Sequence, residues 1–399
     1  MHHGPRPCGA PGPRPRFEVG DIARRCGEEF ARTGALSAEQ RKVLWALSRC
    51  RTAELGGHLD VCDGCGFERP AYNSCRNRHC PKCQALAQHK WLDKRRERIL
   101  PVHHFHVVFT LPADLRELVR MNARRLYALL LRTGPATLLE LGRDPKRLGA
   151  QLGLTAVLHT WRRDLGFHPH LHCVVTGGGL DQEGKWHPTR PKFLFPVRVL
   201  GKLFRGKFCA ALRRLYARGE LCLPASLPDA VAFDELIDRM YQKQWLVYAK
   251  PPFGGADAVY AYLGRYTHRI GISNARLLNV TEQAVTFRTR GDKSVSMPPG
   301  VFLSRLLQHV LPRGLVRIRH FGLLASANVH TRLADARRAL SPAPVDAKPV
   351  VKERCDDEPA HIRLYRELTG IDLRACPRCF SLSMRSHPLP RLPQPRAPP

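Results

Sequence analysis

Two histidines separated by one hydrophobic residue form the segment best suited to metal chemistry. His170 and His172 lie in the string Phe-His-Pro-His-Leu-His-Cys-Val-Val at residues 167–175, at the head of an apolar run. Side chains alternate between the two faces of a strand, so both imidazoles point to one face while Leu171 packs on the other. Two neutral imidazoles on one rigid strand supply two of the three protein ligands of an open divalent-metal site. The alternative is that both histidines only pack.

The third ligand should come from a neighbouring segment. His159 lies in the preceding predicted strand, and pairing of the two strands as a hairpin would bring it opposite His170 and His172. His168 is nearer in sequence, but it shares their face only if the strand already begins there. We favour His159. A metal bound by three histidines keeps open positions for phosphate oxygens.

Paired cysteines predict a structural zinc site. Cys62-x-x-Cys65 and Cys80-x-x-Cys83 are separated by fourteen residues, the spacing of two zinc knuckles that face each other. Each knuckle supplies two thiolates to a tetrahedral ion. The zinc should fold the module and take no part in the reaction.

Other donors leave variants of this zinc site open. Cys75, His79 and His58 are spare donors, which allow a three-cysteine, one-histidine site or a second ion. A later pair, Cys376-x-x-Cys379, has no second pair close by in the sequence, and the residues after it offer no partner knuckle. We therefore do not expect a zinc site at the C-terminal pair.

The charge of the chain points to a nucleic-acid partner. The 65 lysines and arginines outnumber the 34 aspartates and glutamates, which gives a net charge of +31 over 399 residues. The candidate DNA-binding residues are Arg76, Arg78 and Lys82 in the zinc module, and Arg265 and Arg269 further on. Charge that serves only solubility is the alternative. No apolar run of about 18 residues predicts a membrane span. The first residues do not resemble a signal peptide, so we expect a cytoplasmic, nucleoid-associated protein.

Two tyrosines four residues apart are candidate nucleophiles. Tyr262 and Tyr266 lie in a predicted helix, where this spacing places them on one face, one turn apart. Such a pair often serves core packing. The neighbouring Arg265, His268 and Arg269, together with the metal motif, favour a catalytic role. A tyrosine phenolate can attack a metal-polarised phosphodiester and store the bond energy in a covalent link.

The order of the predicted elements indicates an α+β fold. Helices are predicted at residues 17–50, 114–141, 197–219, 233–241, 257–266 and 301–310, and strands at 105–111, 152–161, 170–176, 245–249, 276–290 and 293–297. The glycines at 177–179 should end one strand, and Gly291 should lie near a hairpin turn. The predicted domains are a disordered tail (1–16), a helical lead-in with the zinc module (17–100), a catalytic domain (101–340) and a largely disordered tail (341–399).

Several longer strings occur in the order expected of one family. They are Tyr72–Cys83, Phe105–Leu111, His159–Trp161, His168–His172, Trp245–Gly255 and Tyr262–Ile270, spread over roughly residues 20–335. Together they resemble the two-tyrosine rolling-circle transposases of the HUH endonuclease class, specifically the insertion-sequence ninety-one family with its N-terminal zinc-binding domain. Several motifs of this length in register are far more specific than any one of them.

The resemblance implies both a fold and a reaction. The fold is a central antiparallel sheet whose middle strands carry the metal histidines and whose flanking helix carries the tyrosines. Tyr262 and Tyr266 would nick single-stranded DNA at the transposon ends and join it to a target, leaving a 5′-phosphotyrosine and a free 3′-OH. Mg²⁺ or Mn²⁺ at His170 and His172 would polarise the scissile phosphate.

Two other functions compete with this hypothesis. One is a zinc-dependent nucleic-acid-binding regulator without catalysis, in which His170 and His172 merely pack. The other is a metal-dependent hydrolase of free phosphoesters, which would need carboxylate ligands. The few acidic residues near the histidines, chiefly Asp164, disfavour a hydrolase.

Overall fold

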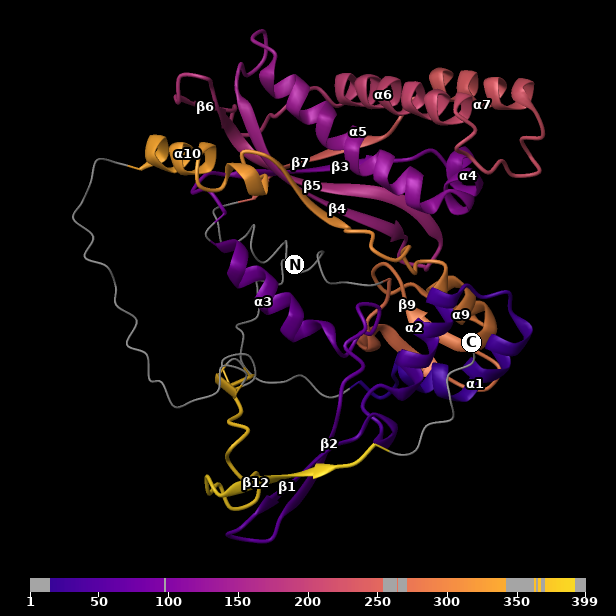
Figure 1. Ribbon diagram of the computed structural model, residues 1–399, viewed down its shortest axis with the longest axis vertical. Helices are drawn as coiled ribbons and strands as arrows, with labels where there is room; N and C mark the ends of the chain where they lie inside the picture. Colours follow the sequence, from indigo (N-terminus) through magenta and orange to yellow (C-terminus); the bar gives the residue numbers. More distant parts are fainter. Residues whose placement is uncertain are drawn as a thin grey trace. The chain divides into compact units, whose positions relative to one another are not determined.

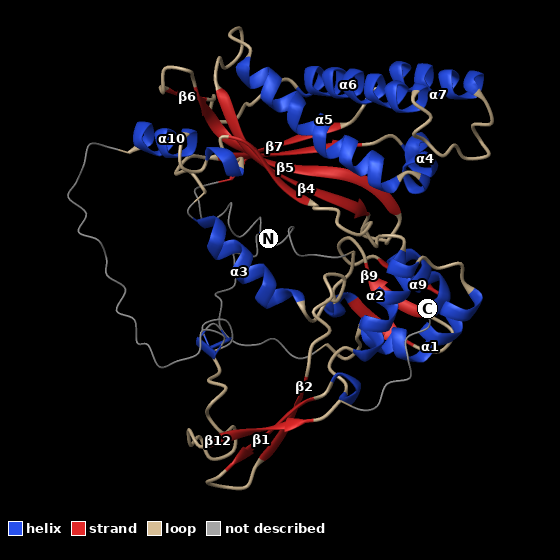
Figure 2. Ribbon diagram, viewed as in Figure 1, coloured by secondary structure: helices blue, strands red, loops and turns tan. Residues whose placement is uncertain are grey.

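The architecture is that of a computed structural model, drawn in Figure 1 and coloured by secondary structure in Figure 2. The structure describes residues 15–96, 98–253, 264, 271–341, 362–363, 365–366 and 370–391. Residues 1–14 of the predicted N-terminal tail lie outside these ranges. So do Tyr262, Tyr266, Arg265 and Arg269.

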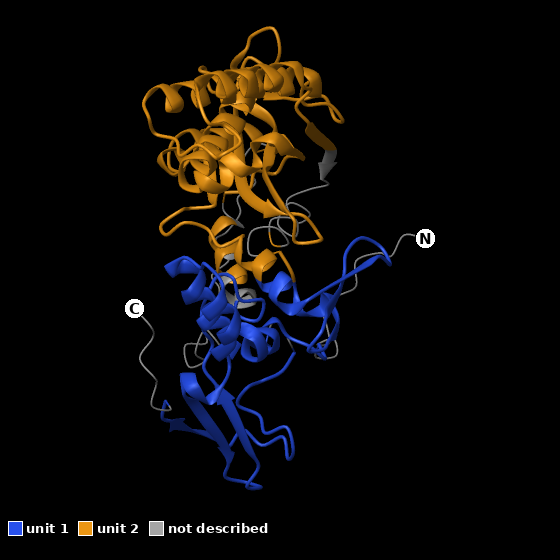
Figure 3. Ribbon diagram, turned by 90° about the vertical axis from the view of Figure 1, so that its right-hand side faces the viewer, with its two compact units in different colours: residues 1–83, 273–303, 345–399 blue, residues 84–272, 304–344 orange. Residues whose placement is uncertain are grey.

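The chain divides into two compact units, which Figure 3 shows in different colours. The first consists of residues 1–83, 273–303 and 345–399, and the second of residues 84–272 and 304–344. This division differs from the predicted domains. Residues 84–100 belong to the second unit, and residues 273–303, predicted as part of the catalytic domain, belong to the first. Residues 345–399, predicted as a separate tail, also belong to the first unit.

A six-stranded antiparallel sheet forms the centre of the second unit. Its strand order is β11-β4-β5-β3-β7, and β6 pairs with β5. The strands are β3 (His104–Thr110), β4 (Gln151–Trp161), β5 (Phe167–Leu180), β6 (Trp186–Pro188), β7 (Val247–Phe253) and β11 (Ile318–Gly322). The mixture of helices with an antiparallel sheet confirms the predicted α+β class.

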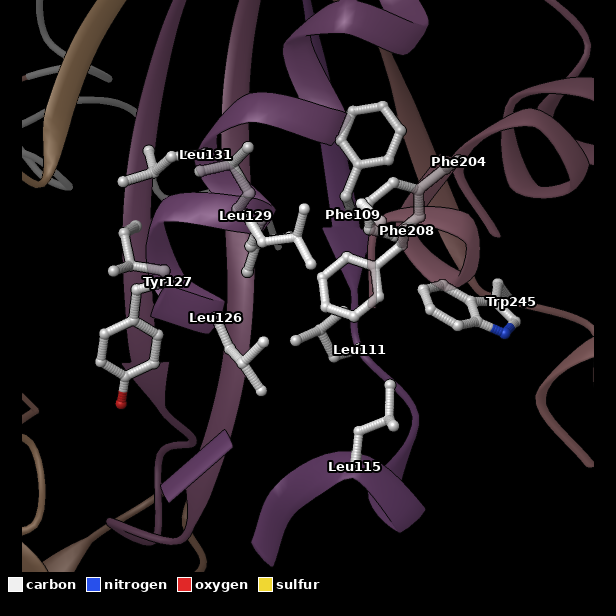
Figure 4. Packing of buried hydrophobic residues seen from close by; sticks show 14 of the residues in the cluster. Phe109, Leu111, Leu115, Leu126, Tyr127, Leu129, Leu131, Phe204, Phe208 and Trp245 are labelled. Atoms are coloured by element: carbon white, nitrogen blue, oxygen red, sulfur yellow. The ribbon is translucent and has the colours of Figure 1, made fainter. Parts of the chain in front are cut away.

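Helices α5 (Ala123–Arg143) and α6 (Val197–Ala217) cover one face of this sheet (Figure 1). The other helices among the described residues of the unit are α3 (Gln84–Arg96), α4 (Arg116–Met121), α7 (Ala230–Gln242) and α10 (Arg332–Leu340). Alternate residues of β3, namely Phe105, Val107 and Phe109, are buried in the core beneath α5 and α6. The Phe109 ring lies 4.9 Å from that of Phe204, which lies 5.1 Å from that of Trp245 (Figure 4). Because strand side chains alternate, the intervening residues of β3 face the other side of the sheet.

The glycine run at 177–179 continues strand β5, whereas the sequence predicts that it ends the strand. β5 extends to Leu180 and pairs with both β4 and β6 in this stretch. A Cβ atom on Gly177 would lie 2.3 Å from the His103 ring. The glycine is therefore needed for close packing inside the sheet.

Helices and a small sheet make up part of the first unit. Its helices among the described residues are α1 (Val19–Thr33) and α2 (Ala38–Arg49), and its meander is β8 (Leu277–Val280), β9 (Val285–Arg288) and β10 (Ser294–Met297). The boundary between the units falls within the next helix, α9 (Pro299–Leu307). β9 and β10 form the predicted hairpin, with Gly291 at a φ of 60° in the turn. The stretch predicted as one strand over residues 276–290 divides into β8 and β9 because the chain reverses between them.

A second sheet of the first unit joins the two ends of the sequence. Its strands are β1 (Gly57–Cys62), β2 (Glu68–Tyr72) and β12 (Met384–Leu389), in the order β12-β1-β2. β12 pairs with β1 in antiparallel register from Gly57 opposite Leu389 to Cys62 opposite Met384. The prediction of a largely disordered tail at residues 341–399 does not extend to this segment, which gains its hydrogen-bond partners from a strand far away in sequence.

Three histidines away from the candidate metal ligands, of which His104 and His309 are buried and His320 is half-buried, make the fold sensitive to acid. Burial lowers the pKa of His104, His309 and His320 to about 4. An unfolded histidine, with a pKa of about 6.5, takes up a proton as the pH falls below that value, whereas the buried one stays neutral. The free energy of unfolding should therefore fall between about pH 6.5 and pH 4, by roughly 2 kcal/mol per histidine at pH 5.

Urea unfolding at about pH 7 and pH 5 measures this loss. The His309→Gln variant should lose less stability between the two pH values than the wild type, because glutamine does not titrate. His330→Gln, at an exposed position, is the matched control and should behave as the wild type does. Equal wild-type stability at both pH values would contradict the prediction.

Candidate metal centre and cysteine clusters

Three histidines from neighbouring strands meet on the face of the sheet opposite the core. His159 on β4 lies directly opposite His170 on β5, and His172 follows on the same face. Their ligand nitrogens all lie within 4.8 Å of one another. The ring centroids are 5.5 Å apart for His159 and His170, 4.8 Å for His170 and His172, and 4.5 Å for His159 and His172. The structure thus brings the three favoured ligands together, and His168 is not part of the group.

Hydrogen bonds orient two of these imidazoles. The Nδ1–H of His170 donates to the carbonyl oxygen of His168 at 2.6 Å, which leaves Nε2 to bind a metal. The Nδ1 of His172 lies 2.8 Å from Nε2 of His106. In the tautomer in which His172 donates, its own Nε2 is likewise available as a ligand. His159 stacks on Trp161 with the ring centroids 4.5 Å apart. The rings are therefore positioned by their surroundings before any ion binds.

Burial keeps the imidazoles of His170 and His172 neutral near pH 7. It lowers the pKa of His170 to about 4 and that of His172 well below its ordinary value. His159 and His172 are nearly inaccessible to solvent, whereas His170 is half-buried. A metal ion requires the neutral form of each ligand. The group is therefore ready to bind a cation and remains reachable on one side.

Cations lie near His168 and His106, two histidines that border the group. Burial, followed by the positive charges of Arg116 and Arg162, lowers the pKa of His168. Burial and the nearby Lys250 lower the pKa of His106 to about 4. Positive charge around an open metal site favours an anionic ligand such as a phosphodiester.

The donor set fits a divalent metal. Three neutral nitrogen ligands on rigid strands leave further coordination positions for substrate oxygens. Within the described ranges no carboxylate joins the group. The Asp164 carboxylate instead accepts hydrogen bonds from the Gly166 amide at 3.0 Å and from Arg162 at 3.3 Å.

The segment with the candidate nucleophiles is described at one position. Gly264, between Tyr262 and Tyr266, is helical. A Cβ atom there would lie 2.9 Å from Nε2 of Gln88 and 3.0 Å from Cδ1 of Leu92. The backbone at residue 264 therefore packs against helix α3.

Helix α3 itself contacts the histidine face of the sheet. The ring of Trp91 on α3 stacks on that of His320 at 6.2 Å. His320 on β11 bonds through Nδ1 to the hydroxyl of Thr155 at 3.0 Å. Thr155 precedes His159 by four residues on β4 and shares its face. Residue 264 and the three histidines thus lie on the same side of the sheet.

Four cysteines of the first unit form a compact cluster. They are Cys50, Cys75, Cys80 and Cys83. The Sγ atom of Cys50 lies 3.3 Å from that of Cys83 and 3.5 Å from that of Cys80, and Cys75 lies 3.6 Å from Cys83. Four converging thiols suit a tetrahedral zinc ion. Cys75 is one of the spare donors, whereas Cys50, the residue after α2, carries no spacing signal and is missed by the sequence.

The predicted zinc tetrad was wrong in its grouping. It consisted of Cys62, Cys65, Cys80 and Cys83. The first pair lies instead beside the C-terminal pair, Cys376 and Cys379, in a second cluster. The physical reason is that β12 pairs with β1, which brings the C-terminal pair to the end of β1. The other two spare donors are engaged elsewhere, since His79 contacts Asn77 at 3.2 Å and His58 faces Asp60 at 3.5 Å.

The basic residues of the zinc module differ in how accessible their charges are to DNA. Arg76 is exposed, and it adopts a left-handed backbone conformation with a φ of 50°. Arg78 is half-buried, and burial lowers its pKa. The ammonium group of Lys82 lies 2.7 Å from the carboxylate of Glu18. Arg76 is therefore the predicted DNA contact with the most accessible charge among these three.

Comparison with known proteins gives two family matches. Residues 153–331 match the "Putative transposase" family, and residues 22–111 match the "Transposase zinc-binding domain". The first match contains the three histidines. The second contains all of the first cysteine cluster and half of the other.

Two relatives extend the similarity over most of the chain. "Putative transposase y4qJ" of Sinorhizobium fredii is 44% identical over 381 residues, which cover 92% of this chain and 94% of the relative. "Transposase for insertion sequence element IS801" of Pseudomonas savastanoi pv. phaseolicola is 28% identical over 319 residues, covering 76% and 75%. No solved structure matches the chain. In the part of the chain that the structure describes, no helix has the length and apolar character to cross a membrane.

Proposed function

Because this chain belongs to the insertion-sequence ninety-one family of transposases, we propose that it nicks and joins single-stranded DNA at the ends of a transposable element. The reaction would pass through 5′-phosphotyrosine intermediates. The observation that supports this proposal best is the convergence of His159, His170 and His172 on the open face of the sheet. Mg²⁺ or Mn²⁺ bound there would polarise the scissile phosphate.

The proposed reaction exchanges one phosphate ester bond for another, with a tyrosine as the temporary partner of the phosphate. The phenolate of Tyr262 or Tyr266 attacks phosphorus, and the bond from phosphorus to the 3′ oxygen breaks. The 3′ oxygen takes a proton and leaves as a free hydroxyl, while the phosphate stays on the tyrosine. Attack of a 3′-OH on that phosphotyrosine reverses the bond changes and joins the strands. Two tyrosines allow a second strand to be held during the transfer.

Basic residues outside the metal group would hold the DNA. Arg265 and Arg269 flank Tyr266 in the sequence, and Arg76, Arg78 and Lys82 belong to the zinc module. The net charge of +31 supports binding to a polyanion and hence association with the nucleoid. Neutralising such residues should weaken binding to all DNA sequences, because phosphate contacts carry no base information.

A gel assay tests the proposal. The full chain is incubated with end-labelled single strands tiled across the DNA that flanks its coding sequence, with and without a divalent ion. Products are separated under denaturing conditions. The proposal predicts a shortened labelled strand and a slow protein-linked band, both dependent on the ion. Binding without any cleavage, whatever ion is supplied, would instead favour a regulator.

The ligand set predicts which ion works best. Mg²⁺ prefers oxygen ligands, whereas all three protein ligands here are nitrogens, which favour first-row transition ions. We expect Mn²⁺ to support nicking at a concentration at least about 10-fold below that required of Mg²⁺. Titrating each ion in the gel assay measures the difference. Equal potency of the two ions would show that nitrogen ligation does not govern the site.

A further inference from the structure

The second cysteine cluster lies at the end of strand β1, and neither family match covers all four of its residues. We propose that Cys62, Cys65, Cys376 and Cys379 bind a second structural zinc ion, which fastens the C-terminal strand to the N-terminal module. The matched zinc-binding domain ends at residue 111, so it includes only half of these ligands.

The four sulfur atoms have the arrangement that a tetrahedral ion needs. The Sγ atoms of Cys62 and Cys379 are 3.5 Å apart, and those of Cys65 and Cys376 are 3.6 Å apart. All four lie within 4.8 Å of one another. Sulfurs bound to one zinc ion at about 2.3 Å lie roughly 3.8 Å from each other, while a disulfide requires about 2.05 Å. The observed separations are therefore closer to zinc ligation than to a disulfide.

The two Cys-x-x-Cys turns have the same backbone hydrogen bonds. In the first, the amide of Cys62 donates to the carbonyl of Phe67, and the amide of Gly66 donates to that of Cys62, both at 2.9 Å. In the second, the amide of Cys376 donates to Ser381, and that of Phe380 donates to Cys376, again both at 2.9 Å. In both turns, the first cysteine is hydrogen-bonded to the residues four and five positions after it.

The repeated turn also has a repeated conformational cost. The residue after the second cysteine is left-handed in both turns, with a φ of 67° at Gly66 and 62° at Phe380. Glycine adopts this conformation readily, whereas phenylalanine does so only with strain. Phe380 is also 79% exposed, so burial of its ring does not offset the strain. A shared ligand that requires both knuckles is an adequate reason for the second turn.

Hydrogen bonds around the sulfurs suit the negative charge of metal-bound thiolates. The amide of Arg378 donates to Sγ of Cys376 at 3.4 Å. The hydroxyl of Ser381 lies 3.4 Å from Sγ of Cys62 and 3.1 Å from Sγ of Cys379. Such donors orient thiolates and lower the cost of gathering four charges. Cys62 and Cys376 are both fully buried, so their thiolate forms would need a bound cation to balance the negative charge.

The ion would close a very long loop. Cys65 and Cys376 are 311 residues apart in the sequence. The strand pairing of β12 with β1 is reinforced by Asp60 on β1, which accepts a hydrogen bond from Ser386 on β12. Metal bonds at the end of this strand pair would make the C-terminal strand an integral part of the zinc module. Removing either cysteine pair should release it.

Zinc content measures the proposal directly. The full chain is prepared with His170→Ala and His172→Ala, so that the histidine group does not contribute to the count. Elemental analysis after dialysis should give two zinc ions per chain. Cys376→Ser with Cys379→Ser should reduce the content to one, and Cys80→Ser with Cys83→Ser should do the same. Cys222→Ser, which changes an exposed cysteine outside both clusters, is the matched control and should retain two.

A cobalt titration keeps the test independent of whether the cysteine variants fold. With all cysteines present, the thiolate-to-metal charge-transfer intensity should rise linearly through two equivalents of Co²⁺, each with the intensity of four thiolates. One equivalent only, or two zinc ions retained after Cys376 and Cys379 are replaced, would overturn the proposal. Neither readout depends on DNA nicking, so the proposed transposase reaction and this zinc site can fail separately.

Discussion

Replacing His170 and His172 by alanine is expected to reduce metal-dependent nicking of single-stranded DNA by at least about 1,000-fold. Stabilisation of phosphate charge by a metal is worth several kcal/mol, and a loss of about 4 kcal/mol corresponds to this factor. The double variant removes two of the three imidazoles that converge on the sheet face. His159 alone would not retain the ion. Rates of product formation in the gel assay at saturating Mn²⁺ measure the effect.

DNA binding separates loss of catalysis from loss of structure. The histidine variant should still bind single-stranded DNA with an affinity close to that of the wild type, because basic residues contact the phosphates. His330→Ala, a histidine-to-alanine change at an exposed position, should leave the nicking rate unchanged. If the double variant nicked DNA at the wild-type rate, the three histidines would have no catalytic role.

Phenylalanine at both Tyr262 and Tyr266 is expected to abolish the covalent link between protein and DNA. The change removes both phenol oxygens and leaves the aromatic rings in place. Without a nucleophile on the protein, no phosphotyrosine can form. The protein-linked band in the denaturing gel should disappear completely, and each single variant should show which tyrosine makes the first nick.

Tyr248→Phe provides the matched control for the tyrosine variants. Tyr248 lies on strand β7 and is 56% exposed, so its hydroxyl is accessible to DNA. Its removal should leave the covalent band intact. If the band persisted in the Tyr262 and Tyr266 double variant and vanished in the Tyr248 variant, Tyr248 on β7 would be the nucleophile instead.

The histidine group could be predicted from the sequence because its geometry is local. The alternation of strand side chains places His170 and His172 on one face. The short turn between β4 and β5 then fixes the register that sets His159 opposite His170. The contribution of His106 could not be found in this way. It comes from β3, whose pairing with β5 joins segments far apart in the chain.

The grouping of the cysteines could not be predicted because it depends on contacts between distant segments. Sequence spacing identifies a Cys-x-x-Cys knuckle, but it does not say which other knuckle faces it. The position of Cys376 follows from the pairing of β12 with β1, and β12 has no strong strand pattern, with Pro388 inside it. Cys50 lies at the end of a helix and has no partner in a short motif.

Two long amphipathic helices were predicted with bounds close to the observed ones, whereas several short strands were not predicted, and the stretch predicted as helical over residues 17–50 divides into α1 and α2. Helices α6 and α7 coincide with the stretches predicted at 197–219 and 233–241 because their apolar spacing repeats over several turns. β1, β2 and β11 have only five or six residues each. So few residues give little periodicity, and their pairing partners decide their conformation.

Mass spectrometry of the protein after incubation with single-stranded DNA and Mn²⁺ tests the central claim most directly. Nuclease digestion leaves a nucleotide remnant on the attacked residue, and trypsin separates the two candidates because Arg265 lies between them. The account predicts the remnant on the peptide that contains Tyr262, on the one that begins at Tyr266, or on both. A remnant found on any other residue, or a nicked strand with no remnant on the protein, would contradict it.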